Sequence, residues 1–203
     1  MSEIRLGSAY KHAKRDRRRN EILDAAASVF AQKGYFAATM QDIAALLELR
    51  SASLYYYFKS KEAALEEVCR RGGREFVEEL GAHVDSGRPV LETMELGIRL
   101  HLESRWRDYV ASFAFNRQNL PDGILTEMNA IAREYVDLWR RILDRGKDAG
   151  VFRQDLDTVF AAHAILAICN STASTYPGED RSSGLTVATV SSMILGGIRD
   201  TAR

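Results

Sequence analysis

The chain has 203 residues, 46% hydrophobic and 28% charged, which suits one or two globular domains with a buried core. Its two cysteines, Cys69 and Cys169, exclude a disulfide framework, and their spacing matches no metal-binding pattern. The formal net charge is zero, but residues 1–60 hold ten basic and six acidic residues, an excess that favours nucleic acid as a partner at this end.

The residue pattern predicts an all-α fold. Proline is scarce, at 3 residues, and runs of Val, Ile and Thr bounded by turns are absent. No apolar run approaches the ~18 residues that a membrane-spanning helix needs. The basic N-terminus is not followed by the apolar segment of a secretory signal. We therefore expect a cytoplasmic protein without a membrane partner.

Residues 1–15 show no apolar periodicity, but basic residues cluster between positions 11 and 19. Two readings stay open: a solvated, partly disordered tail, or a basic arm that contacts DNA phosphates or enters a minor groove. The first helix is predicted over residues 16–33, where apolar residues recur at helical spacing. Gly34 stands where a helix-ending glycine is expected. This helix would supply a core for the short elements after it.

Residues 39–61 predict two short helices joined by a tight turn. Thr39 and Asp42 have the spacing of a capping box. A second helix is predicted over residues 51–57, and Ser60 is expected to cap a third helix that begins at the next residue. Three helix starts within about two dozen residues are typical of a helix-turn-helix.

In a helix-turn-helix the second helix lies in the DNA major groove and the first crosses the backbone. A run of three tyrosines is by itself more typical of packing, but the order of cap, turn, small residues, aromatic residues and lysines favours recognition. Residues expected at base edges are Ser51, Ala52, Ser53 and Tyr56, and those expected near phosphates are Tyr55, Tyr57, Lys59 and Lys61.

The segment RNEILDAAASVFAQKGYFAATMQDIAALLELRSASLYYYFKSKEAALEEV resembles the DNA-binding domain of TetR-family transcriptional regulators. The shared pattern is I-L-x-A-A-x-x-x-F-x-x-x-G-Y, then T-x-x-D-I-A, then L-Y-x-Y-F-x-S-K-E-x-L. The resemblance implies a homodimer with a DNA-binding domain, here residues 1–60, and a ligand-binding and dimerisation domain, residues 61–203. It also implies that a small molecule releases the protein from double-stranded operator DNA.

The matched positions imply roles for individual residues. Residues that match the family's DNA contacts are Thr39 and Gln41 on the crossing helix, Ser51, Ala52 and Ser53 at the start of the recognition helix, and Tyr55 and Lys61 at phosphates. Glu48 stands where the family usually has glycine in the turn, and a non-glycine residue in a left-handed conformation costs about 1 kcal/mol. Arg50 replaces the family's usual turn serine, so Ser51 could take over capping.

The remaining chain is predicted to form further helices. Gly72 and Gly73 interrupt the third helix and mark either a close packing contact or a flexible point. Residues 159–169 are apolar on all sides except at His163, which predicts burial against a helix of a second subunit. We therefore expect a homodimer formed through residues 156–176 and 185–199, which resemble the family's four-helix interface.

The sequence holds no catalytic constellation. The motifs G-x-x-x-x-G-K-[ST], G-x-S-x-G, H-E-x-x-H and paired C-x-x-C are absent, so we expect no enzyme, cofactor or metal site. Aromatic residues of the middle helices would line an apolar pocket, although each one alone is more typical of core. The residues expected to bind the ligand are Trp106, Tyr109, Phe113, Tyr135 and Trp139.

The C-terminal region loosely resembles the branch of the family that responds to fatty-acyl or steroid-CoA thioesters. Members of that branch often have Trp and Arg before the Pro-Gly loop, where this chain has Asn170 and Ala173. The missing Arg weakens the case for an acidic CoA ligand.

We predict a dimeric, ligand-responsive repressor that leaves its operator when a small apolar or amphipathic effector binds. Linkage provides the mechanism, because a ligand that prefers the DNA-incompetent state must lower DNA affinity. Two alternatives are an all-helical enzyme that uses the aromatic cavity and an architectural DNA-binding protein without a ligand.

Overall fold

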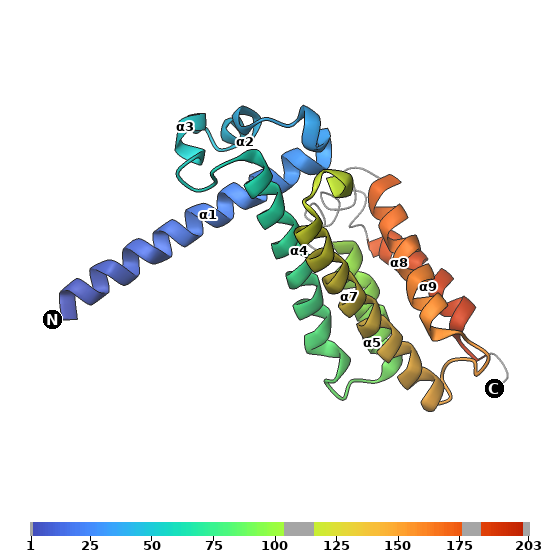
Figure 1. Ribbon diagram of the computed structural model, residues 1–203. Helices are drawn as coiled ribbons and strands as arrows, with labels where there is room; N and C mark the ends of the chain where they lie inside the picture. Colours follow the sequence, from blue (N-terminus) through green and yellow to red (C-terminus); the bar gives the residue numbers. More distant parts are fainter. Residues whose placement is uncertain (1, 104–115, 176–183, 201–203) are drawn as a thin grey trace. The chain divides into compact units, whose positions relative to one another are not determined.

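The computed structural model describes residues 2–103, 116–175 and 184–200, and α-helices dominate these ranges (Figure 1). The all-α prediction is confirmed, with an isolated β-bridge between Phe152 and Arg199 as the only β-pairing in the described part. The elements are α1 (Ser2–Ala37), α2 (Met40–Leu46), α3 (Ser51–Leu54), α4 (Lys61–Val84), α5 (Val90–Glu103), η1 (Arg117–Asn119), α7 (Asp122–Asp148), α8 (Thr158–Thr175) and α9 (Gly184–Ile198).

The chain divides into two compact units, and two of the boundaries lie inside long helices, α4 and α7. The first unit comprises Met1–Arg71 and Asp108–Leu125, and the second comprises Gly72–Arg107 and Thr126–Arg203. The first unit thus contains the whole predicted DNA-binding domain, the first turns of α4 and a segment from the middle of the chain. The functional division at residue 60 remains a proposal.

Helix α1 begins far earlier than the sequence pattern predicted. It starts at Ser2, whereas the expected helix covered residues 16–33 and left the N-terminus as a tail or arm. Residues 2–15 lack an apolar stripe but are rich in Ala, Lys, Arg and Glu, whose intrinsic helix propensity is high. Gly34 breaks the helical geometry with φ 72°, close to where the helix was expected to end.

The first unit has one core under the helix-turn-helix. The side chains that fill it come from α1, α2, α3 and the start of α4, and they include Ile22, Val29, Phe30, Ile43, Leu54, Phe58, Leu65 and Val68. The first helix therefore is the scaffold that the sequence predicted, because the four residues of α3 cannot bury an apolar face alone.

The second unit packs α5 and the second part of α4 around α7. Trp139 of α7 is fully buried, and its ring edge lies where a Cβ atom at Gly97 of α5 would be only 3.1 Å away. Gly73 of α4 is equally crowded, because a Cβ there would lie 2.9 Å from Ile131 Cγ2. Of the two readings for Gly72 and Gly73, the structure supports a close packing contact.

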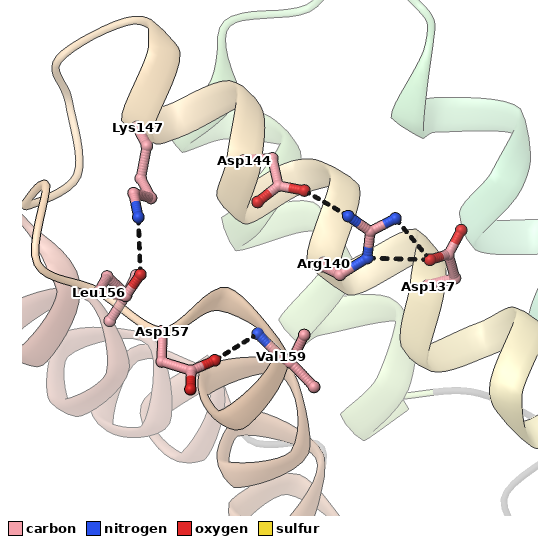
Figure 2. Close-up of polar contacts among 7 residues, drawn as sticks. All are labelled: Asp137, Arg140, Asp144, Lys147, Leu156, Asp157 and Val159. Carbon is pink, nitrogen blue, oxygen red and sulfur yellow. Dashed lines mark hydrogen bonds and ion pairs between the residues drawn. The ribbon is translucent and has the colours of Figure 1, made fainter.

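Figure 2 shows polar contacts along α7 and at the connection from α7 to α8. Arg140 bridges Asp137 and Asp144 along one face of α7. Lys147 then donates to the Leu156 carbonyl oxygen at 2.8 Å, and the Asp157 carboxylate accepts from the Val159 backbone N–H at 3.0 Å. The Asp157 side chain therefore caps the start of α8.

Helix α8 is not buried on all sides within the subunit. Ile165 is only 3% exposed and faces the subunit core, whereas Phe160 is 72% exposed and Val159 53%. His163, the polar exception among residues 159–169, is exposed in the subunit, and its Nδ1 lies 2.9 Å from the Val159 carbonyl oxygen. Helix α8 therefore has one face buried in the subunit and one exposed face, which its apolar sequence pattern did not distinguish.

Candidate nucleic-acid interface and effector region

Caps and a left-handed residue shape the helix-turn-helix. The Asp42 backbone N–H donates to Thr39 Oγ1 at 3.1 Å, and the Thr39 N–H donates to the Asp42 carboxylate at 2.9 Å, which confirms the capping box. Glu48 has φ 53°, so this residue takes the left-handed conformation expected of the turn without the usual glycine.

The start of the recognition helix differs from the prediction. Arg50 occupies the N-cap position without a side-chain hydrogen bond, and Ser51 is the first helical residue, so Ser51 does not cap α3. The α-helix ends at Leu54 and continues as turns through residue 57, which makes it shorter than expected. Ser60 does cap α4, since its Oγ accepts from the Ala63 N–H at 3.2 Å.

Most predicted DNA contacts lie on accessible surface of the first unit. Tyr55 and Tyr56 are 54% and 68% exposed, although neighbouring Leu54 is fully buried. The predicted contact residues that are also exposed are Thr39, Gln41, Ala52, Ser53 and Lys59, while Ser51 is half-buried. Tyr57, the third tyrosine, is half-buried and packs edge-to-face on the Tyr56 ring, with 5.2 Å between the ring centroids. The packing role therefore belongs mainly to the third tyrosine.

Two of the predicted phosphate contacts already have partners within the subunit. Lys61 Nζ donates to the carbonyl oxygens of Tyr35 at 2.6 Å and Ala38 at 3.0 Å, and lies 4.2 Å from the Tyr35 ring centroid. The Thr39 hydroxyl belongs to the capping box and also lies 2.9 Å from an Asp42 carboxylate oxygen. Lys61 therefore ties the start of α4 to the chain between α1 and α2, leaving one of its three N–H donors for a phosphate.

The basic cluster at the N-terminus separates into two groups. Arg17, Arg18 and Arg19 form ion pairs within the unit, with Glu21 and Glu67 as their partners. Arg15 instead lies over the Tyr56 ring, with the guanidinium carbon 5.4 Å from the centroid. An exposed tyrosine of the reading surface is thus backed by a cation of α1.

In the second unit, buried His101 is the centre of a polar network that includes Tyr135, one of the predicted ligand residues, and the exposed Asn170. His101 is 5% exposed; its Nδ1 lies 3.1 Å from the Tyr135 hydroxyl and its Nε2 3.0 Å from Asn170 Oδ1. Phe76 packs edge-to-face on both His101 and Tyr135. Trp106, Tyr109 and Phe113 lie outside the described residues, so the structure brings together only Tyr135 and Trp139 of the five.

The network is electrically neutral. Burial lowers the pKa of His101 to about 4, although the hydrogen bond to Asn170 acts in the opposite direction. Burial raises the pKa of Tyr135, which the Trp139 side chain partly offsets. Because Asn170 Oδ1 is an acceptor, His101 Nε2 carries the proton, and the Tyr135 hydroxyl donates to Nδ1.

Sequence patterns alone did not indicate that His101 belongs to this region. His101, Tyr135 and Asn170 are separated by 34 and 69 positions, so only the fold brings them together. Trp139 Nε1 is buried and has no hydrogen-bond partner of good geometry among the described residues. Within the described ranges, no group of acidic, His and Cys residues could hold a metal ion, and no helix is long and apolar enough to cross a membrane.

Comparison with known proteins identifies both parts of the chain. Residues 22–68 match the family model of bacterial regulatory proteins, tetR family, and residues 87–179 match that of the tetracyclin repressor-like C-terminal domain. The chain belongs to the TetR family. It is a ligand-responsive, DNA-binding transcriptional repressor and not an enzyme.

Relatives of this TetR-family protein agree in sequence and fold. The HTH-type transcriptional repressor KstR2 of Rhodococcus jostii is 30% identical over 147 residues, which are 71% of this chain and 72% of the relative. The ketosteroid transcriptional regulator KstR2 of Mycobacterium tuberculosis superposes with a TM-score of 0.72 at 27% identity, covering 90% of this chain and 95% of the other. AibR, solved with isovaleryl coenzyme A and operator DNA, has a TM-score of 0.73 at 21% identity, covering 90% of this chain and 98% of the other. It shares the fold.

Proposed function

We propose that this TetR-family repressor reads operator DNA through the surface formed by α3 and the turn after it. The observation that carries the proposal is the exposure of Tyr55 and Tyr56 directly after the buried anchor Leu54. A large aromatic side chain that gains nothing from the subunit core is available to stack or pack against a partner. The small residues that precede it allow close approach to base edges.

The remaining DNA contacts follow from position and chemistry. Gln41 and Thr39 lie at the start of the crossing helix α2, where backbone N–H groups and the helix dipole favour a phosphate. Lys61 would add its remaining N–H donor. Base contacts are assigned to Ser51, Ala52, Ser53 and Tyr56, and phosphate contacts to Thr39, Gln41, Tyr55 and Lys61. The target DNA lies in the bacterial cytoplasm, so we place the protein there.

Replacing Tyr56 by Ala tests the reading surface. A duplex from the region flanking the gene and a scrambled duplex of equal length serve as probes for fluorescence anisotropy. We expect the Tyr56→Ala variant to lose affinity for the flanking duplex by about tenfold or more and to bind scrambled DNA almost as the parent does, because base contacts and not phosphate contacts are removed. Equal loss on both duplexes would remove Tyr56 from base reading.

We further propose that the protein works as a homodimer through the open faces of α8 and α9. These helices run side by side in the second unit (Figure 1). They expose five large apolar side chains, namely Val159, Phe160, Ile168, Leu185 and Met193. A Cβ atom at Gly196 or Gly197 would meet no atom of the subunit within 4 Å, so α9 offers a smooth stretch for close helix approach. A second copy of the chain, presenting the same face, is the occupant that fits both helices at once.

The effector is proposed to be a small apolar or amphipathic molecule that binds in the second unit near Tyr135 and Trp139. The buried network there supplies hydrogen-bonding groups but no charge, since His101 stays neutral above about pH 4. KstR2, named for ketosteroids, and AibR, solved with an acyl-CoA, show the breadth of effectors among relatives and structural neighbours. This chain has Asn170 and Ala173 where the CoA-responsive branch often has Trp and Arg, and because the Arg is missing we favour an uncharged effector.

A ligand titration tests this assignment. Steroids, fatty acids, acyl-CoAs and aromatic drugs are titrated while the fluorescence of the tryptophans is followed, with and without operator DNA. Reciprocity requires that an inducer which weakens operator binding tenfold is itself weakened tenfold by operator. A ligand with equal affinity in both conditions is not the inducer. Unchanged ligand binding in a Tyr135→Phe variant would move the site away from the network.

A further inference from the structure

Asn116 is a buried polar residue that reaches the helix-turn-helix from a distant part of the sequence. Asn116 is 1% exposed. Among the described residues, the other buried polar side chains are those of Thr93 and His101. Its Oδ1 accepts a hydrogen bond from the Tyr35 backbone N–H, and its Nδ2 lies 3.5 Å from the Phe30 carbonyl oxygen. The partners are 81 and 86 positions away, and all three residues belong to the first unit.

The two bonds hold the chain on both sides of a break in α1. Phe30 precedes and Tyr35 follows Gly34, whose φ of 72° and ψ of 166° depart from helical values. Backbone groups beside such a break need partners outside the regular helical ladder. An amide side chain carries both a donor and an acceptor, so one Asn can serve the carbonyl on one side and the N–H on the other.

The backbone turn to which Asn116 bonds also contacts the start of α4 and leads directly into α2. Lys61, at the start of α4, donates to the carbonyl oxygens of Tyr35 and Ala38. The Tyr35 hydroxyl bonds to Glu62 on the same turn of α4, and Thr39, the cap of α2, follows Ala38 directly. Helix α3 is connected to α2 at one end and to α4 at the other, so its position depends on this turn.

We propose that Asn116 is a positioning residue for DNA reading: by fixing the backbone around Gly34 it sets where α2 and α4 hold the recognition helix. Asn116 stands six residues before α7, the helix that carries Tyr135 and Trp139 of the effector region. The segment that bears Asn116 is therefore one covalent connection between α7 and the first unit, and α4, which also crosses the unit boundary, is another. The inference rests on the proposed reading surface and names a residue outside it that controls its geometry.

An Asn116→Ala variant tests the proposal, with Asn119→Ala as the matched control. Asn119 lies in the same short segment, is half-buried and has no side-chain hydrogen bond among those described. The probes are a duplex selected by the parent protein from a random-sequence pool and a scrambled duplex. We expect Asn116→Ala to lower affinity for the selected duplex about tenfold, with little change on the scrambled one, because an unsatisfied N–H loosens the turn. Amide exchange at Tyr35 should accelerate in the same variant, and Asn119→Ala should match the parent in both measurements.

An Asn116→Asp variant separates positioning from folding. It keeps the volume and the acceptor oxygen for the Tyr35 N–H but removes the donor to Phe30, so we expect it to retain most of the selectivity that the Ala variant loses. If circular dichroism shows that Asn116→Ala does not fold, Asn116→Leu, which removes both hydrogen-bonding groups but fills the space, takes its place with the same expected loss of selectivity. Faster exchange at Tyr35 with unchanged selectivity in Asn116→Ala, or equal loss of selectivity in a folded Asn116→Asp, would overturn the proposal. Failure of the parent protein to select any duplex would instead refute the reading surface itself.

Discussion

His101 shows how a single residue ties stability to pH. Burial lowers its pKa to about 4 in the folded protein, from the usual value of 6.5. The unfolded chain thus takes up a proton near pH 6.5 that the folded chain resists until about pH 4. Stability from this residue is complete above pH 6.5 and is lost as the pH falls towards 4, by about 3 kcal/mol in all.

A comparison of the parent with a His101→Gln variant measures this effect. Urea unfolding at pH 7.5, 5.5 and 4.5 and at one fixed protein concentration should show a steep loss of unfolding free energy in the parent. The Gln variant has no imidazole to protonate, so its loss over the same range should be smaller by about 3 kcal/mol. Identical slopes for the two proteins would contradict the buried, neutral state of His101.

Single residues also show what the sequence could predict. The capping box of Thr39 and Asp42 and the left-handed Glu48 depend on neighbours a few positions apart, and both predictions are confirmed. The hydrogen bond between buried His101 and Asn170 could not be predicted, because it depends on how α5 and α8 pack. Lys61 was matched to a phosphate contact, but its ties to Tyr35 and Ala38 need the fold to be seen.

At the scale of elements, apolar periodicity predicted most of the helices. It missed the start of α1 and did not show which face of α8 is buried. Residues 2–15 have no apolar stripe, yet α1 includes them because their intrinsic propensity favours a helix. In α8 the opposite occurs, since apolar residues on every side conceal which face is buried. Ile165, within the range predicted to form the dimer interface, is 3% exposed and lies in the subunit core, so a substitution that tests the dimer belongs on the open face.

The turn between α7 and α8 depends on one glycine. A Cβ atom at Gly146 would lie 1.9 Å from Phe152 Cδ2 and 2.2 Å from Cε2, while Phe152 itself is fully buried. We expect Gly146→Ala to lower the free energy of unfolding by about 3 kcal/mol, because the ring has no space to retreat. Gly123, also in α7, has no atom within 4 Å of its Cβ position, so Gly123→Ala should be neutral or stabilising by up to about 1 kcal/mol. Equal effects in thermal unfolding of the two variants would refute this packing.

At the scale of the whole molecule, the exposed apolar faces of α8 and α9 predict the oligomeric state. Phe160→Glu places a charge within the proposed interface and should convert the dimer to a folded monomer, since an unpaired buried charge is costly. Ala132→Glu, on an exposed position of α7, is the matched control and should remain dimeric. Light scattering at micromolar concentration distinguishes the two, and a dimeric Phe160→Glu protein would place the interface elsewhere.

The dimer and the reading surface together predict how DNA binding depends on salt. If each subunit makes about four phosphate contacts, the dimer neutralises roughly eight, and the logarithm of affinity should fall with the logarithm of salt concentration with a slope near −7. A monomer with one reading surface would give about half this slope.

The central claim, that a dimer recognises a specific sequence through the surface around α3, is tested most directly by anisotropy titrations at several salt concentrations. The probes are DNA flanking the gene and a scrambled duplex of equal length. The account predicts a slope near −7 on the flanking DNA and an affinity at least about a thousandfold above that for scrambled DNA near physiological salt. Equal affinities for the two duplexes at every salt concentration would contradict it.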